Sequence, residues 1–123
     1  MAGKNPIGWF EIHVNDFDKA REFYGGLFNW EFKLSQGSKS QYWNIFTGDN
    51  SIGGGFMKKD KPEHDGQAVI LYVEVENIEE TLKKAGELGG STHTPKALIN
   101  ENAGYFALLS DNDGNVIGLW SKN

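Results

Sequence analysis

The chain has 123 residues, no cysteine and a formal net charge of −5, so disulfides, thiol catalysis, zinc fingers and iron–sulfur clusters are excluded. A chain of this length buries about two thirds of its unfolded surface, and we expect residues 1–123 to form a single domain. The acidic balance argues against nucleic-acid binding, and neither a membrane span nor a signal peptide is evident. We therefore expect a soluble, cytoplasmic protein that contacts neither nucleic acid nor membrane.

The first half of the chain predicts one strand, one helix and three further strands. Residues 9–14 alternate with period two, so that Trp9, Glu11 and His13 lie on one strand face. Asp16 is an N-cap candidate for the helix that follows. Apolar residues then recur at helical spacing and predict a buried stripe: Phe17, Ala20, Phe23, Tyr24, Leu27 and Phe28. Strands are predicted over 29–35, 42–47 and 51–57.

The second half repeats this order. Residues 68–75 predict a strand, and Asn77 is an N-cap candidate with Glu80 three residues later, as in a capping box. The predicted buried stripe of this helix contains Ile78, Leu82, Ala85 and Leu88. The pair Gly89-Gly90 is typical of a helix end, and strands are predicted over 91–98, 105–109 and 116–120.

Both halves therefore read as a β-α-β-β-β unit, over about 7–57 and 68–121, with a linker over about 58–67. At an offset of 61 residues Val14 meets Val75 and Asp16 meets Asn77. At an offset of 64 Gly54 meets Gly118 and Phe56 meets Trp120. Internal duplication is the simplest explanation.

Three segments carry a family resemblance: HVNDFDKAREFYGGLFNWEF, the closing hairpin DNDGNVIGLW and the GWFE opening. Together with the paired units, they resemble the glyoxalase/bleomycin-resistance/extradiol-dioxygenase superfamily, also called vicinal oxygen chelate proteins. The resemblance covers nearly the whole chain. It implies an α+β fold in which eight strands curve into a cup, with two helices outside and a ligand or metal on the concave face.

The resemblance also implies where metal ligands would stand, namely once on the first and once on the last strand of each unit. Counting from the acidic turn and the closing hairpin, these places are Trp9, near Gly54, Ile70 and Gly118. None offers an imidazole or carboxylate, so we expect neither a metal nor another cofactor. A shift of one or two residues would bring Glu11, His13, Tyr72 or Glu74 to these places and keeps the metal alternative open.

The strand alternation then predicts which residues line the cup. These candidate ligand-binding residues are Trp9, Glu11, His13, Phe56, Ile70, Tyr72, Glu74, Gly118 and Trp120. Large apolar walls with a few polar groups are typical of small-molecule pockets, although the aromatic residues could equally fill a core. Glu11 and His13 are also candidates for acid–base catalysis. The run 53–55 of three glycines is either a bulged or flexible strand or room for a ligand against bare backbone.

These observations favour a metal-free protein that binds a small aromatic or cationic compound. The alternative is a glyoxalase- or dioxygenase-like enzyme (a lyase, isomerase or oxidoreductase) that acts on a small oxygenated substrate and could depend on a metal. We also expect a homodimer, because residues 42–47 predict a long sheet edge on which Trp43 and Ile45 have no obvious partner.

Overall fold

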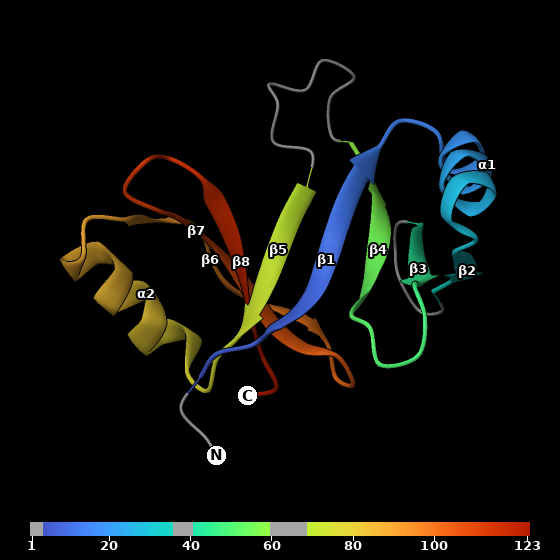
Figure 1. Cartoon of the computed structure of the whole chain (residues 1–123). Helices are drawn as coiled ribbons and strands as arrows, with labels where there is room; N and C mark the ends of the chain where they lie inside the picture. The colour runs from blue at the N-terminus through green and yellow to red at the C-terminus, as the bar shows by residue number, and fades with distance from the viewer. Residues whose placement is uncertain (1–3, 36–40, 60–68) are drawn as a thin grey trace. The chain divides into compact units, whose positions relative to one another are not determined.

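The computed structural model describes residues 4–35, 41–59 and 69–123. Its elements follow the predicted order of two β-α-β-β-β units (Figure 1). They are β1 (Ile7–Val14), α1 (Phe17–Phe28), β2 (Glu31–Leu34), β3 (Tyr42–Phe46), β4 (Gly53–Lys58), β5 (Val69–Glu74), α2 (Ile78–Glu87), β6 (Ser91–Asn100), β7 (Gly104–Ser110) and β8 (Val116–Ser121). The predicted α+β class is confirmed. Most of the predicted linker, from residue 60 on, lies outside the described residues.

The chain forms two compact units, which we call the N-terminal unit (Trp9–Ile70) and the C-terminal unit (Met1–Gly8 with Leu71–Asn123). In the N-terminal unit the strand order is β2-β3-β4-β1, with β1 and β4 parallel and the other two pairs antiparallel. In the C-terminal unit the order is β5-β8-β7-β6, again with one parallel pair, β5 and β8. The two units thus have the same strand topology, and their origin by duplication stays a prediction.

Both helices begin at the predicted caps. The Asp16 side chain accepts from the backbone N–H of Lys19 at 3.0 Å, and the Asn77 side chain accepts from that of Glu80 at 2.9 Å. These bonds satisfy amides that the first helical turn leaves without a partner. The end of α2 is also as predicted, since Gly89 adopts a φ of 102° that a side chain would disfavour.

The core of the N-terminal unit is aromatic. Phe56 is fully buried, and its ring lies 5.6 Å from that of Tyr24 and 5.4 Å from that of Phe32. Ala20 and Ile45 are the other buried residues of this cluster. The side chains packed against them are Phe10, Ile12, Val14, Phe17, Tyr24, Trp30, Phe32 and Trp43. One face of β1 thus packs against α1.

The core of the C-terminal unit is mostly aliphatic. Ile78, Ala107 and Leu119 are buried at its centre, and their partly buried neighbours are Val73, Val75, Leu82, Tyr105 and Leu109. Ile78 stands at the first position of α2 and is fully buried. The helix therefore anchors to the sheet through the start of its apolar stripe.

Four predicted stripe residues are exposed, contrary to expectation. Phe23 is 61% exposed, because the row formed by Phe17, Ala20 and Tyr24 already faces the core and a helix can turn only one side toward a sheet. Leu88 is 74% exposed, because α2 ends at Glu87 and the side chain leaves the helical stripe there. Leu27 and Phe28 are also more than half exposed.

The reason given for a homodimer is wrong. Strand β3 lies between β2 and β4 and is no sheet edge. Ile45 is buried, and Trp43 packs against the same core. The dimer itself stays a prediction.

In the described parts of the chain, no helix is both long and apolar enough to span a membrane.

Candidate functional site

The face of β1 that points away from α1 carries its polar side chains. Because side chains alternate along a strand and Phe10 and Ile12 pack in the helix-facing core, Trp9, Glu11 and His13 share the opposite face. Glu11 is only 8% exposed, although a carboxylate is strongly hydrated in water. Its burial therefore calls for hydrogen-bond partners.

Four side chains of the N-terminal unit form a hydrogen-bonded series on this face. The indole Nε1–H of Trp9 donates to the Tyr42 hydroxyl at 2.9 Å, and this hydroxyl donates to Glu11 Oε2 at 3.0 Å. The other carboxylate oxygen, Oε1, lies 2.9 Å from Nε2 of His13. We call Trp9, Glu11, His13 and Tyr42 the β1–β3 network.

The order of donors in the β1–β3 network follows from its chemistry. An indole nitrogen can only donate, so the Tyr42 oxygen accepts from Trp9 and its own proton is directed to Glu11. When Glu11 is ionised, both of its oxygens accept, and Nε2 of His13 must carry a proton. The network thus holds a carboxylate beside two aromatic rings, with an imidazole in hydrogen-bond contact.

Tyr42 was missing from the predicted site. It belongs to β3, whose residues Trp43 and Ile45 face the core, so Tyr42 and Asn44 face the other way. The alternation of YWNIF was visible in the sequence. The neighbourhood of β3 and β1, which are separated by β4, was not.

The glycine run is a regular strand. Residues 53–55 pair with β1 on one side, residues 54 and 55 with β3 on the other, and neither register shifts along the pairing. A Cβ added to Gly54 would lie 2.6 Å from the Phe10 ring, and one added to Gly55 would fall on the Tyr42 ring. Neighbouring rings therefore occupy the space that was interpreted as a bulge or as room for a ligand.

Phe56 was placed on the wrong face. It pairs with Ile12 and lies fully buried in the helix-facing core. Gly55 pairs with Glu11 in one unit, as Gly118 pairs with Tyr72 in the other, so the last strands correspond at an offset of 63 residues. The predicted offset of 64 is thus wrong by one, and one residue reverses the face of a strand. Phe56 corresponds to the buried Leu119, and Gly55 replaces Gly54 as the residue that corresponds to Gly118.

The C-terminal unit brings four predicted residues onto one face. Tyr72 pairs with Gly118 and Glu74 with Trp120, and the Tyr72 ring lies where a Cβ on Gly118 would stand. The Trp120 indole donates to the backbone oxygen of Ala103 at 2.6 Å. Glu74 is exposed, and its carboxylate lies over Gly8. The predicted residue Ile70, the last of the N-terminal unit, is buried on β5.

The residues that the structure describes do not fit a metal centre. Among residues 4–35, 41–59 and 69–123, no group of three or more histidine, aspartate and glutamate side chains could hold an ion. On the last strands, the positions beside Glu11 and Tyr72 are glycines covered by tyrosine rings. Glu11 and His13 bond to each other, and a divalent ion would need further nitrogen or oxygen ligands there.

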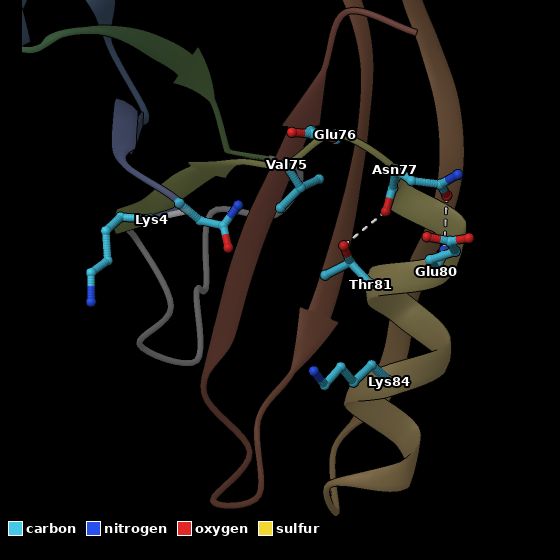
Figure 2. Close-up of a pocket in the computed structure, with 8 residues that line it drawn as sticks. Lys4, Val75, Glu76, Asn77, Glu80, Thr81 and Lys84 are labelled. Carbon is cyan, nitrogen blue, oxygen red and sulfur yellow. Dashed lines mark hydrogen bonds between the residues drawn. The ribbon is translucent and has the colours of Figure 1, made fainter. Parts of the chain in front are cut away.

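A second, open groove lies at the start of α2 (Figure 2). It is lined by Lys4, Asn5, Val75, Glu76, Asn77, Glu80, Thr81 and Lys84. Two acceptors at the helix start are already used, since the Asn77 side chain accepts from the Glu80 backbone N–H and the Asn77 backbone oxygen accepts from the Thr81 hydroxyl at 2.8 Å (Figure 2). This groove is therefore a weaker candidate than the β1–β3 network.

Comparison with known proteins identifies the fold and the family. A hypothetical protein from Bacillus halodurans superposes with a TM-score of 0.72 at 14% identity, covering 98% of this chain and 96% of that one. Methylmalonyl-CoA epimerase from Mycobacterium tuberculosis gives 0.67 at 13% identity, with coverages of 100% and 93%. A methylmalonyl-CoA epimerase in complex with methylmalonyl-CoA and NH4+ gives 0.68 at 12% identity, with coverages of 95% and 94%.

At these identities the likeness is one of fold alone. The comparison with curated proteins found no match. Residues 6–119 match the sequence profile of the Glyoxalase/Bleomycin resistance protein/Dioxygenase superfamily, and the chain therefore belongs to this superfamily.

Proposed function

We propose that this protein binds a small, planar aromatic cation at the β1–β3 network. The observation that carries the proposal is the Glu11 carboxylate, which is 8% exposed and hydrogen-bonded to the phenol of Tyr42. Tyr42 in turn accepts from the indole of Trp9. A ligand at this network would meet one negative charge and two aromatic rings.

Each of these groups favours a cation with a flat apolar body. Stacking on an aromatic ring contributes about 0.5–1.5 kcal/mol beyond the burial of area. A cation near an indole or phenol face gains about 0.5–1 kcal/mol when exposed and about 2 kcal/mol when desolvated. The carboxylate would add selectivity for positive charge, because an anion beside a partly buried carboxylate is repelled.

A matched pair of probes tests this proposal. N-methylquinolinium is a planar cation, and quinoline is nearly the same shape without the charge at neutral pH. Chemical-shift titrations should show tighter binding of the cation. Glu11→Gln should remove the difference between the probes, and Trp9→Ala should weaken both. Glu31→Gln, at an exposed position on β2 of the same unit, is the control and should change neither.

Equal affinities for the two probes, unaffected by Glu11→Gln, would overturn the preference for a cation.

A second candidate function is general acid–base catalysis on a small oxygenated substrate. It is favoured by the 2.9 Å contact between Glu11 Oε1 and His13 Nε2, because a carboxylate that orients an imidazole is a recurrent acid–base arrangement. Two proteins of this fold are named methylmalonyl-CoA epimerases, and epimerisation beside a carbonyl requires exchange of a carbon-bound proton.

This candidate predicts deuterium incorporation into methylmalonyl-CoA when the protein is incubated with it in heavy water. His13→Gln should abolish the incorporation, whereas His93→Gln, at an exposed position on β6, should not. Absence of incorporation with the unaltered protein would rule out this substrate.

We further propose that binding requires no metal or other cofactor; for a metal, this is supported by the lack of a group of three or more suitable ligands among the described residues. Treatment with EDTA should leave both probe binding and melting temperature unchanged. Stoichiometric zinc, nickel, manganese or iron in protein purified without chelator, removed by EDTA together with stability, would falsify this.

We retain the homodimer as a proposal about assembly. Light scattering at micromolar concentration should give the mass of two chains, and the mass of one chain would contradict it.

A further inference from the structure

Tyr42 makes an unusual close approach to the backbone of the neighbouring strand. It pairs with Met57 on β4, yet its ring leans diagonally along β4 onto Gly55, two residues away. The ring covers the position that a Cβ on Gly55 would occupy. Any other residue at position 55 would therefore push the ring away from its present place.

The packing of the Tyr42 ring on Gly55 fixes where the Tyr42 hydroxyl lies. Gly55 pairs directly with Glu11 on β1, so a ring lying over Gly55 brings its oxygen to the Glu11 side chain. The same oxygen lies 3.0 Å from Glu11 Oε2 and 2.9 Å from Trp9 Nε1. One hydroxyl thus joins the carboxylate to the indole, and both belong to the proposed ligand site.

We propose that Tyr42, whose ring packs on Gly55, is the positioning residue that orients the Glu11 carboxylate and the Trp9 indole for the ligand. This inference rests on the proposed function, because it assigns Tyr42 and Gly55 a role in that site. Gly55 becomes a specificity-determining position, since its missing side chain leaves room for the tyrosine and not for the ligand.

The C-terminal unit contains a similar packing of a tyrosine ring on a glycine. Gly118 occupies the position equivalent to Gly55, and it too lies under a tyrosine ring, that of Tyr72. The two rings come from different strands, because Tyr72 belongs to β5 and pairs with Gly118 directly, whereas Tyr42 belongs to β3. A ring on a glycine therefore recurs, and in the N-terminal unit the approach from β3 brings the Tyr42 hydroxyl between Glu11 and Trp9.

Tyr42→Phe is the decisive variant, because it keeps the ring on Gly55 and removes the hydroxyl. The indole N–H signals of the four tryptophans can be followed by nuclear magnetic resonance of the free protein, and the signal that is lost in Trp9→Phe is that of Trp9. We expect Tyr42→Phe to shift the Trp9 signal and to leave the other three in place. Affinity for N-methylquinolinium should fall roughly tenfold, as expected for the loss of hydrogen bonds to a charged group.

Gly55→Ala tests the packing of the Tyr42 ring on Gly55 and should shift the same Trp9 signal. If that variant fails to fold, the double variant Gly55→Ala with Tyr42→Ala provides the test, because removing the ring makes room for the added methyl group. The change Gly55→Ala should then lower the melting temperature less in the Tyr42→Ala background than in the unaltered protein. Gly26→Ala is the control, since a Cβ there meets nothing within 4 Å.

The outcomes separate the two proposals. If the unaltered protein binds no planar cation but Tyr42→Phe shifts the Trp9 signal, the proposed function fails while the positioning role stands. An unchanged Trp9 signal in Tyr42→Phe overturns the positioning role, whether or not a ligand binds. If Gly55→Ala lowers the melting temperature equally with and without the Tyr42 ring, the role assigned to Gly55, leaving room for that ring, is overturned.

Discussion

The two units have the same topology but different side chains at corresponding positions. Glu11 and His13 correspond to Tyr72 and Glu74 at the offset of 61 residues that aligns the first strands. In the N-terminal unit these positions join the β1–β3 network. In the C-terminal unit Glu74 is exposed and lies over Gly8. The two units therefore share the strand order and the helix caps, while the side chains on the polar face differ.

The largest expected effects test whether the cores are equivalent. Phe56 and Leu119 correspond and are both buried. Phe56→Ala should lower the free energy of unfolding by about 3–5 kcal/mol and Leu119→Ala by about 2–5 kcal/mol, because each leaves a cavity. Phe23→Ala, at a 61% exposed site, should cost less than about 1 kcal/mol. Urea unfolding of the three variants measures this, and a loss at Phe23 as large as that at Phe56 would contradict the helix orientation.

The helix caps should contribute less. Asn77→Ala removes the acceptor for the Glu80 amide and should lower the free energy of unfolding by about 0.5–2 kcal/mol. The loss should be the same at pH 7 and pH 3, since the asparagine amide does not titrate in this range. A loss that varies with pH would show that the cap acts through another group.

The equivalent cap Asp16 should depend on pH. The backbone N–H of Lys19, which donates to the carboxylate, lowers the pKa of Asp16 below its usual 3.8. A lowered pKa in the folded state means that the stabilisation is complete above pH 3.8 and is lost as the pH falls through the folded value. The difference in melting temperature between the unaltered protein and Asp16→Asn should therefore shrink below about pH 4.

The pH dependence must be measured as the difference in melting temperature between the unaltered protein and Asp16→Asn, and not on the unaltered protein alone. The side chain and backbone of Asn115 lower the pKa of Asp111 in the turn before β8, so the unaltered protein loses this second contribution in the same direction. Both proteins contain Asp111, and its effect cancels in the difference. A difference that grows toward low pH would contradict the cap assignment.

The smallest expected effects compare the tryptophans of the two units in ligand binding. Trp9→Ala should weaken binding of N-methylquinolinium by about two- to tenfold, the equivalent of one stacked ring. Trp120→Ala should weaken it less, because the Trp120 indole is directed to the backbone oxygen of Ala103. A larger effect at Trp120 would move the proposed site toward the C-terminal unit.

The sequence by itself determined the element order, both helix caps and the alternation of β1. These features depend on neighbours close in the chain: Asp16 and Asn77 bond to amides three residues later. The separation of Trp9, Glu11 and His13 from Phe10 and Ile12 likewise needs only the two-residue period of a strand. Local chemistry fixes such features, so the residues of one segment are enough to predict them.

Tertiary structure decided everything that depends on pairing between strands. The register of β4 against β1 places Phe56 in the core and Gly55 beside Glu11, which counting from a turn misplaced by one residue. The order β3-β4-β1 brings Tyr42 to Glu11 across an intervening strand of glycines. The side of α1 that packs on the sheet also leaves Phe23 exposed. Each of these outcomes is set by which distant segments pair or pack together, and a pattern along one strand carries no information about its partner's register.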